Sequence, residues 1–166
     1  FLYLTHFRSG ALSLLYVPTG EVISTVMGTP DSGLSPSLWL DPFEGLVYAP
    51  ATRANADNPI LTFDTTAFPV VNVFSLRNMT VVFARRLALD VADRPVNLPF
   101  DVSLDRPRRW LWVVNAGSND VSVIDLNTGF SRANIPVGAN PRGLVRYADG
   151  SFAFVYNALD GTISVI

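Results

Sequence analysis

The sequence predicts an all-β fold, and three features of its composition point to it. All twelve cationic residues are Arg, the acidic residues are twelve Asp and only two Glu, and Lys and Gln do not occur. Because helix surfaces usually rely on Lys, Glu and Gln, helices are disfavoured. Twelve Pro and eleven Gly separate short runs rich in Val, Leu, Phe and Tyr, as expected of many short strands joined by turns.

The same composition limits the function. The 166 residues are 49% hydrophobic and 16% charged, which is enough apolar material for a folded core. The absence of Cys rules out a disulfide scaffold or a thiolate metal site. A formal net charge of -2 disfavours nucleic-acid binding. The longest uncharged segments, 9–20 and 65–76, are shorter than the roughly 18 residues of a membrane-spanning helix, so we expect no membrane span.

Strand-like segments recur along the chain at fixed offsets. Residues 111–115 align with residues 2–6 at an offset of 109, and residues 121–124 then align with residues 12–15 without a gap. The last copy repeats both segments 42 residues later, at 153–157 and 163–166. A divergent copy lies between the first and the third, and its two halves have offsets of 65 and 50 from the third copy. The difference between these two offsets, 15, predicts a 15-residue insertion within residues 51–69.

Each repeat unit reads as four strands. In the third copy, the strand at 111–115 and the alternating strand at 121–124 are followed by strand-like segments at 131–137 and 143–147, with tight turns between them. Four strands in about 42 residues is the size of one blade of a β-propeller. We therefore predict one partial propeller domain over residues 1–166, with repeat units of about 1–45, 46–109 (insertion 51–69), 110–151 and an incomplete 152–166.

The predicted architecture is a β-propeller arc of four-stranded antiparallel blades. Propellers close by completing a ring, and an open arc leaves apolar blade faces uncovered. The chain also starts and ends in strand-like segments, 1–4 and 163–166, and no signal peptide is visible. We therefore expect the chain to be part of something larger, with the remaining blades in further sequence or in another protein subunit.

Four stretches resemble the YVTN family of WD40-like β-propeller repeats: Trp112 to Asn115, Asn119 to Asp125, Ile135 to Gly143, and Asp149-Gly150. The match is specific in the third copy and weakest in the second, where Pro50 replaces the Asn. The resemblance implies a seven-bladed ring and a protein that is extracellular or periplasmic.

No residues with a catalytic pattern stand out. His6 is the only histidine, and it aligns with the turn residues Asn115 and Asn157, so we interpret it as structural. Ser122 and Ser164 recur with the repeat and are better strand residues than nucleophiles. The Asp residues are scattered at turns, and no two of them are singled out as an acid/base pair. We predict no catalytic and no metal site.

The insertion is the least repeat-like segment and hence the candidate for binding. Its polar residues Arg53, Asp57, Asn58 and Asp64 could contact a ligand, since loops on a rigid scaffold often do. The oxygen atoms could hold a hard cation, although the spacing matches no EF-hand, and packing of the loop on a neighbouring blade or subunit is the favoured alternative. The basic run at 106–109 is expected to be solvated turn charge.

The sequence thus favours a non-enzymatic, exported scaffold or protein-interaction module, such as an accessory subunit of a periplasmic or cell-surface complex. No cofactor is expected within this segment. The alternative is a propeller domain of a periplasmic redox protein, because some similar propellers bind haem or are fused to cytochrome domains. Haem would then enter only through regions outside these residues. A lactonase-like hydrolase is a third possibility, for which no acid/base set is identified.

Overall fold

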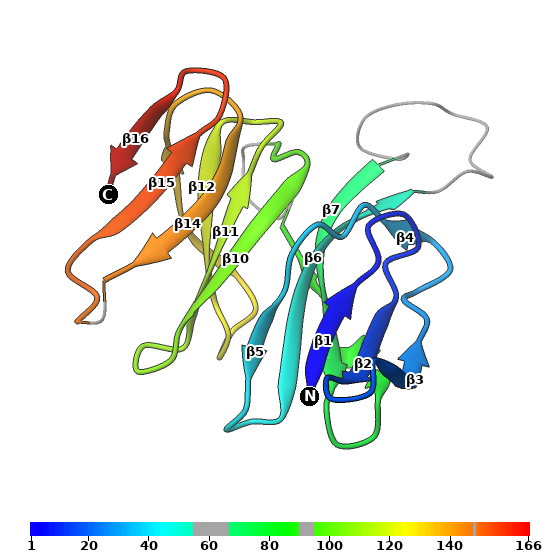
Figure 1. The fold of residues 1–166 in the computed structure, drawn as a ribbon. Helices are drawn as coiled ribbons and strands as arrows, with labels where there is room; N and C mark the ends of the chain where they lie inside the picture. Colours follow the sequence, from blue (N-terminus) through cyan, green and yellow to red (C-terminus); the bar gives the residue numbers. More distant parts are fainter. Residues whose placement is uncertain (55–66, 90–94, 148) are drawn as a thin grey trace. The chain divides into compact units, whose positions relative to one another are not determined.

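The computed structural model describes residues 1–54, 67–89, 95–147 and 149–166, and these form sixteen strands (Figure 1). Within these ranges the only helical element is a single 3₁₀ turn, η1 (Phe83–Arg85). Neighbouring strands pair antiparallel throughout the described ladders. The all-β prediction is confirmed. The chain divides into two compact units, an N-terminal unit (Phe1–Leu87) and a C-terminal unit (Ala88–Ile166).

The N-terminal unit is built from two sheets. Sheet A is three-stranded in the order β1-β2-β3, with bounds β1 (Leu2–Thr5), β2 (Leu12–Tyr16) and β3 (Glu21–Val26). Sheet B is ordered β4-β6-β7-β8, β5 also pairs with β6, and β9 pairs with β7. Its bounds are β4 (Ser32–Gly33), β5 (Trp39–Asp41), β6 (Leu46–Ala54), β7 (Ala67–Ser75), β8 (Thr80–Val81) and β9 (Leu87–Ala88).

The C-terminal unit is also built from two sheets. Sheet C has four strands in sequence order: β10 (Pro99–Asp105), β11 (Trp110–Asn115), β12 (Asp120–Asp125) and β13 (Ser131–Pro136). Sheet D has three: β14 (Pro141–Arg146), β15 (Ala153–Asn157) and β16 (Thr162–Val165). Gly129 and Gly150 turn the chain between strands with φ of 76° and 74°, the left-handed region that Gly enters without a steric penalty.

The sheets and the sequence repeats are out of phase by one strand. The segment read as the fourth strand of the third repeat unit, 143–147, falls largely in β14, which pairs with β15 and so belongs to sheet D. Conversely, β10 lies before that repeat unit but pairs with β11 in sheet C. A sequence period gives the spacing of the strands but does not tell which strand begins a sheet.

In each unit the two sheets bury apolar side chains against each other. In the N-terminal unit Leu12 of sheet A packs with buried side chains of sheet B, namely Val47, Ala49 and Phe74. In the C-terminal unit Val114 and Val121 of sheet C pack with Leu144, Ala153 and Val155 of sheet D. Each buried Val, Leu or Phe side chain of these clusters stabilises the fold by about 1.5–3 kcal/mol relative to leaving it in water. Face-to-face packing of consecutive sheets is the arrangement expected of propeller blades.

Candidate functional site

Of the four binding residues predicted in the insertion, Asp57, Asn58 and Asp64 lie outside the described residues. Arg53 is near the end of β6, where its guanidinium donates to the Asp31 carboxylate and lies 5.6 Å from the ring centroid of Phe68. Arg86 lies 3.5 Å from the same carboxylate. The structure therefore ties Arg53 to the body of the N-terminal unit through an ion pair with Asp31.

The environment of Asp31 leads us to expect that the free energy of unfolding falls at acid pH. Burial by itself raises the pKa of this carboxyl, but hydrogen bonds from Thr29 and Arg53 and the charges of Arg86 and Arg53 together outweigh it, so the pKa lies below its ordinary value. A depressed pKa stabilises the fold above the unfolded pKa of about 3.9, and this contribution disappears as the pH falls through the folded pKa.

We therefore expect the free energy of unfolding to fall more steeply from about pH 5 to about pH 2 in the wild type than in Asp31→Asn. Urea titrations monitored by circular dichroism at several pH values measure both slopes. Identical slopes would show that Asp31 has the same pKa in the folded and unfolded chains.

An Asn–Ser contact recurs where the first strand of a repeat unit meets the second. Asn115 Nδ2 donates to Ser122 Oγ at 2.8 Å, and Asn157 Nδ2 donates to Ser164 Oγ at 2.9 Å. In sheet A, His6 occupies the place of the Asn, and its Nε2 lies 2.7 Å from Ser13 Oγ. Because this contact matches those of the Asn residues, it accounts for His6 without a catalytic role.

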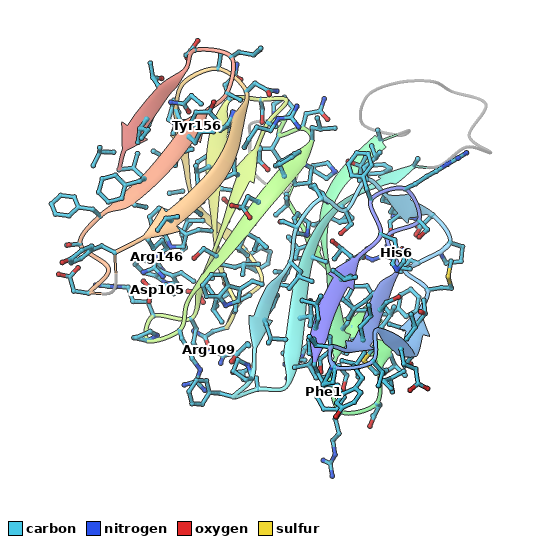
Figure 2. All side chains as sticks on the ribbon, in the orientation of Figure 1. Phe1, His6, Asp105, Arg109, Arg146 and Tyr156 are labelled. Carbon is cyan, nitrogen blue, oxygen red and sulfur yellow. The ribbon has the colours of Figure 1, made fainter. Side chains whose placement is uncertain are left out.

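Sheet D carries an apolar outer face. Val145, Phe154 and Val165 lie side by side across its three strands, and Tyr156 pairs with Ile163 in the next row. All five side chains are between 41% and 68% exposed. Figure 2 shows Tyr156 on β15. We call these five residues the outer face of sheet D. It is the largest run of exposed apolar side chains that share one register in the described ladders of the C-terminal unit.

The repeat explains why these exposed side chains are apolar. At the offset of 42, Tyr156 and Ile163 correspond to Val114 and Val121 of sheet C. Those two residues are fully buried, because sheet D packs against them. Sheet D therefore presents outward the same kind of face that sheet C buries against its neighbour.

Sheet A exposes the complementary kind of face. Through the two repeat offsets, Leu2 and Leu4 of β1 correspond to Ala153 and Val155 of β15. Ala153 and Val155 are buried against sheet C, whereas Leu2 and Leu4 are 46% and 40% exposed. Two kinds of face meet between sheets C and D, one from each sheet. The chain exposes the sheet C kind on the outer face of sheet D, and the sheet D kind on sheet A.

A buried ion-pair cluster joins sheets C and D. Asp105 at the end of β10 is only 3% exposed at its side chain, and its Oδ2 accepts hydrogen bonds from Arg146 Nη2 at 2.7 Å and Arg108 Nη1 at 3.0 Å. Figure 2 shows Asp105 and Arg146 side by side. The Arg146 guanidinium lies 5.6 Å from the ring centroid of Trp112, and that of Arg108 lies 5.8 Å from Trp110.

The run at 106–109 is largely exposed, as expected of turn charge, and Arg108 in addition pairs with buried Asp105 while its own side chain stays 46% exposed. Asp105 is buried and holds Arg108 on one side and Arg146 on the other. Its partner Arg146 lies 41 residues away in the chain. A second carboxylate of β10 adds to the same junction, since Asp101 Oδ2 accepts the Leu144 backbone N–H at 2.8 Å.

No group of three or more His, Asp or Glu side chains in the described residues is placed to hold a metal ion. No helix in these parts of the chain is long and apolar enough to cross a membrane.

Comparison with solved structures shows the fold. The chain superposes on a chain of Kuenenia stuttgartiensis hydrazine synthase with a TM-score of 0.84 and 14% identity, covering 99% of this chain and 54% of that one. It also superposes on a chain of a nidogen/laminin complex with a TM-score of 0.66 and 14% identity, over the same shares of both chains. Both structures contain β-propellers, so the β-propeller prediction is confirmed, although the ring and its blade number stay predictions.

The chain spans about half the length of these two structural neighbours. No family model matches the sequence, and the search of curated proteins finds no match either.

Proposed function

We propose that this chain is part of an exported, non-enzymatic β-propeller of the YVTN type that serves as a scaffold or protein-interaction module. The observation that carries the proposal is the outer face of sheet D, whose side chains correspond by the repeat to side chains that sheet C buries. Contiguous exposed apolar surface of this kind marks a binding surface.

The partner of this face is a further β-sheet of the same repeat type. Sheet D packs on sheet C with small aliphatic side chains, Ala153 and Val155, set against Val114 and Val121. A sheet with aliphatic residues at the places of Ala153 and Val155, as sheet A has in Leu2 and Leu4, fits the outer face in the same way. Such a sheet is supplied by the remaining blades of the propeller or by another protein subunit, as in an accessory subunit of a periplasmic or cell-surface complex.

The likeness to a chain from a nidogen/laminin complex supports a role in protein association, since that propeller was crystallised with a protein partner. This support is of fold alone, because the identity is 14%.

The experiment replaces Phe154 by Asp on the outer face in the complete gene product purified from its own source. The matched control is Leu159→Asp, at a turn residue that is 77% exposed and lies outside the face. Light scattering gives the molar mass, and thermal unfolding gives Tm. If another subunit covers the face, Phe154→Asp lowers the molar mass and leaves Tm nearly unchanged. If blades of the same chain cover it, Phe154→Asp lowers Tm at constant mass. Equal behaviour of the two variants in both measurements would contradict the proposal.

Export is tested by fractionation of the source cells with an antibody against the chain. The proposal expects the protein in the periplasmic or extracellular fraction. Recovery with the cytoplasmic marker would contradict this part of it.

A propeller domain of a periplasmic redox protein is the second candidate, favoured by the TM-score of 0.84 to a chain of hydrazine synthase. A visible absorption spectrum of the complete protein tests it. Haem bands that respond to dithionite would support the redox role, with the haem held outside the residues described above. A colourless complete protein would leave the scaffold role.

A further inference from the structure

The free edge of β3 carries exposed apolar side chains. β3 is the last strand of sheet A, and among the described residues it pairs only with β2 (Figure 1). No other backbone hydrogen bond within the described chain involves residues 21–26. Val22, Ile23 and Met27 are 56%, 49% and 63% exposed. The edge therefore offers both unpaired backbone groups and apolar side chains to a partner strand.

The equivalent strand of sheet C is protected against such pairing. At the offset of 109, β3 corresponds to β13, which is also an edge strand and has a β-bulge at the same place. The extra residue of the bulge is Arg132 in β13 but Ile23 in β3, and Pro136 of β13 corresponds to Met27. Charged residues and Pro keep other strands from adding to an edge. β13 has both kinds of residue, whereas residues 22–27 have neither.

The other free edges are explained by the repeat or by their own sequences. β1 and β16 correspond to β11 and β12, which have a neighbouring strand on each side, so their uncharged sequences are expected. β10 and β14 begin with Pro and carry charged residues. The outermost strands of sheet B are two or three residues long, and short edge strands are poor templates for pairing. Among the described strands, β3 is therefore the long uncharged edge that the repeat leaves unexplained.

The composition of this edge fits a second copy of the same strand. Residues 22–27 include four β-branched residues and contain no charged residue, no Pro and no Gly. Short segments of this composition are the ones that pair with identical copies of themselves. Each chain has one such edge, so a two-fold pair uses both edges and stops at a dimer.

The charges and apolar side chains of the strand also suit antiparallel pairing with a copy of itself. The regular part of β3 after the bulge is centred on Thr25. Pairing about this residue sets Ile23 opposite Met27 of the second copy, so that apolar side chains meet. Glu21 is the only charged residue between positions 9 and 30. Antiparallel pairing moves the two Glu21 carboxylates to opposite ends of the interface, where they do not repel each other.

We propose that the protein forms a two-fold dimer in which the β3 strands of two copies pair antiparallel along their free edges. The two copies of sheet A then form one continuous sheet of six strands. Backbone hydrogen bonds provide the affinity, as in other cases of strand addition. Because each copy contributes one strand, the interface is small and the dimer should dissociate on dilution.

Light scattering of the complete gene product over a range of concentrations tests the dimer. We expect the molar mass to double with concentration in the wild type but not in Ile23→Arg, which gives β3 the residue of β13. The matched control is Val17→Arg, at a residue of the β2–β3 turn that is 61% exposed, and it should behave as the wild type does. Equal molar masses of the wild type and Ile23→Arg at every concentration would overturn the proposal, and so would the same loss of mass in both variants.

Disulfide trapping tests the register of the pair. The chain has no Cys, and directly opposite residues of paired antiparallel strands lie close enough for a disulfide. Under mild oxidation, Thr25→Cys should give a cross-linked dimer, with the bond located by mass spectrometry. The matched control is Asn134→Cys, at the equivalent position of β13, and it should give none. Cross-linking of neither variant, or of both to the same extent, would contradict the pairing of β3.

Circular dichroism spectra that match the wild type verify that each variant is folded. None of these substitutions lies on the outer face of sheet D, so the result does not depend on the partner proposed for that face.

Discussion

Asp105→Ala is expected to lower the free energy of unfolding of the C-terminal unit by about 3–5 kcal/mol. The carboxylate is 3% exposed and compensates Arg146, whose side chain is only 12% exposed. Without Asp105, a nearly buried guanidinium loses its counter-charge, and the hydrogen bond that links β10 to β14 is lost. Guanidinium chloride titration monitored by tryptophan fluorescence measures the change, in a Trp39→Phe background so that only Trp110 and Trp112 report.

The control for this prediction is Arg108→Gln in the same background. Arg108 is 46% exposed and pairs with the same carboxylate, so its removal should cost about 1 kcal/mol or less. If the two variants were equally stable, Asp105 would be acting as an ordinary surface carboxylate. That result would contradict the claim that it compensates a nearly buried Arg146.

Asn115→Ala is expected to cost about 2–4 kcal/mol. Asn115 is fully buried, and its Nδ2 donates to Asp120 Oδ1 at 2.6 Å and to Ser122 Oγ at 2.8 Å. The substitution removes both hydrogen bonds and leaves two nearly buried acceptors without this donor. The same fluorescence-monitored titration measures the loss.

The matched control is His6→Asn. His6 follows β1 and aligns with Asn115 and Asn157 in the other copies of the repeat. In His6→Asn, the amide can donate to Ser13 Oγ as Asn115 does to Ser122, so circular dichroism should show little change in stability. A large loss in His6→Asn, or none in Asn115→Ala, would contradict the equivalence of the two positions.

The repeat made the fold predictable, whereas the Asn–Ser contacts were found only in the structure. Aligning His6 with Asn115 indicated a structural role for His6, but residues that recur at one offset do not all share one environment, because Val114 is buried whereas its equivalent Tyr156 is half exposed. The assignment of strands to sheets was not predictable in the same way, because β13 and β14 are neighbours in the chain but belong to different sheets.

The cluster around Asp105 was not predictable because it departs from the repeat. Asp105 and Arg146 are far apart in the chain. At the offset of 42, the residue that corresponds to Arg146 is Leu104, so the repeat gives no reason to expect an Arg there. The contact between Asp105 and Arg146 depends on how sheet D packs on sheet C, and a single sequence carries no signal for such a pairing. In the insertion, only Arg53 could be placed, and its partner Asp31 is likewise distant in sequence.

The most direct test of the central claim, that the outer face of sheet D is covered by another sheet, is chemical labelling of an engineered Cys in the complete native protein. The chain itself contains no Cys, so Tyr156→Cys on the face and Leu159→Cys in the adjacent turn each introduce a thiol whose labelling is located by mass spectrometry. We predict that a maleimide labels Cys at 159 rapidly and Cys at 156 only after denaturation. Equally rapid labelling at both positions in the native protein would contradict the claim.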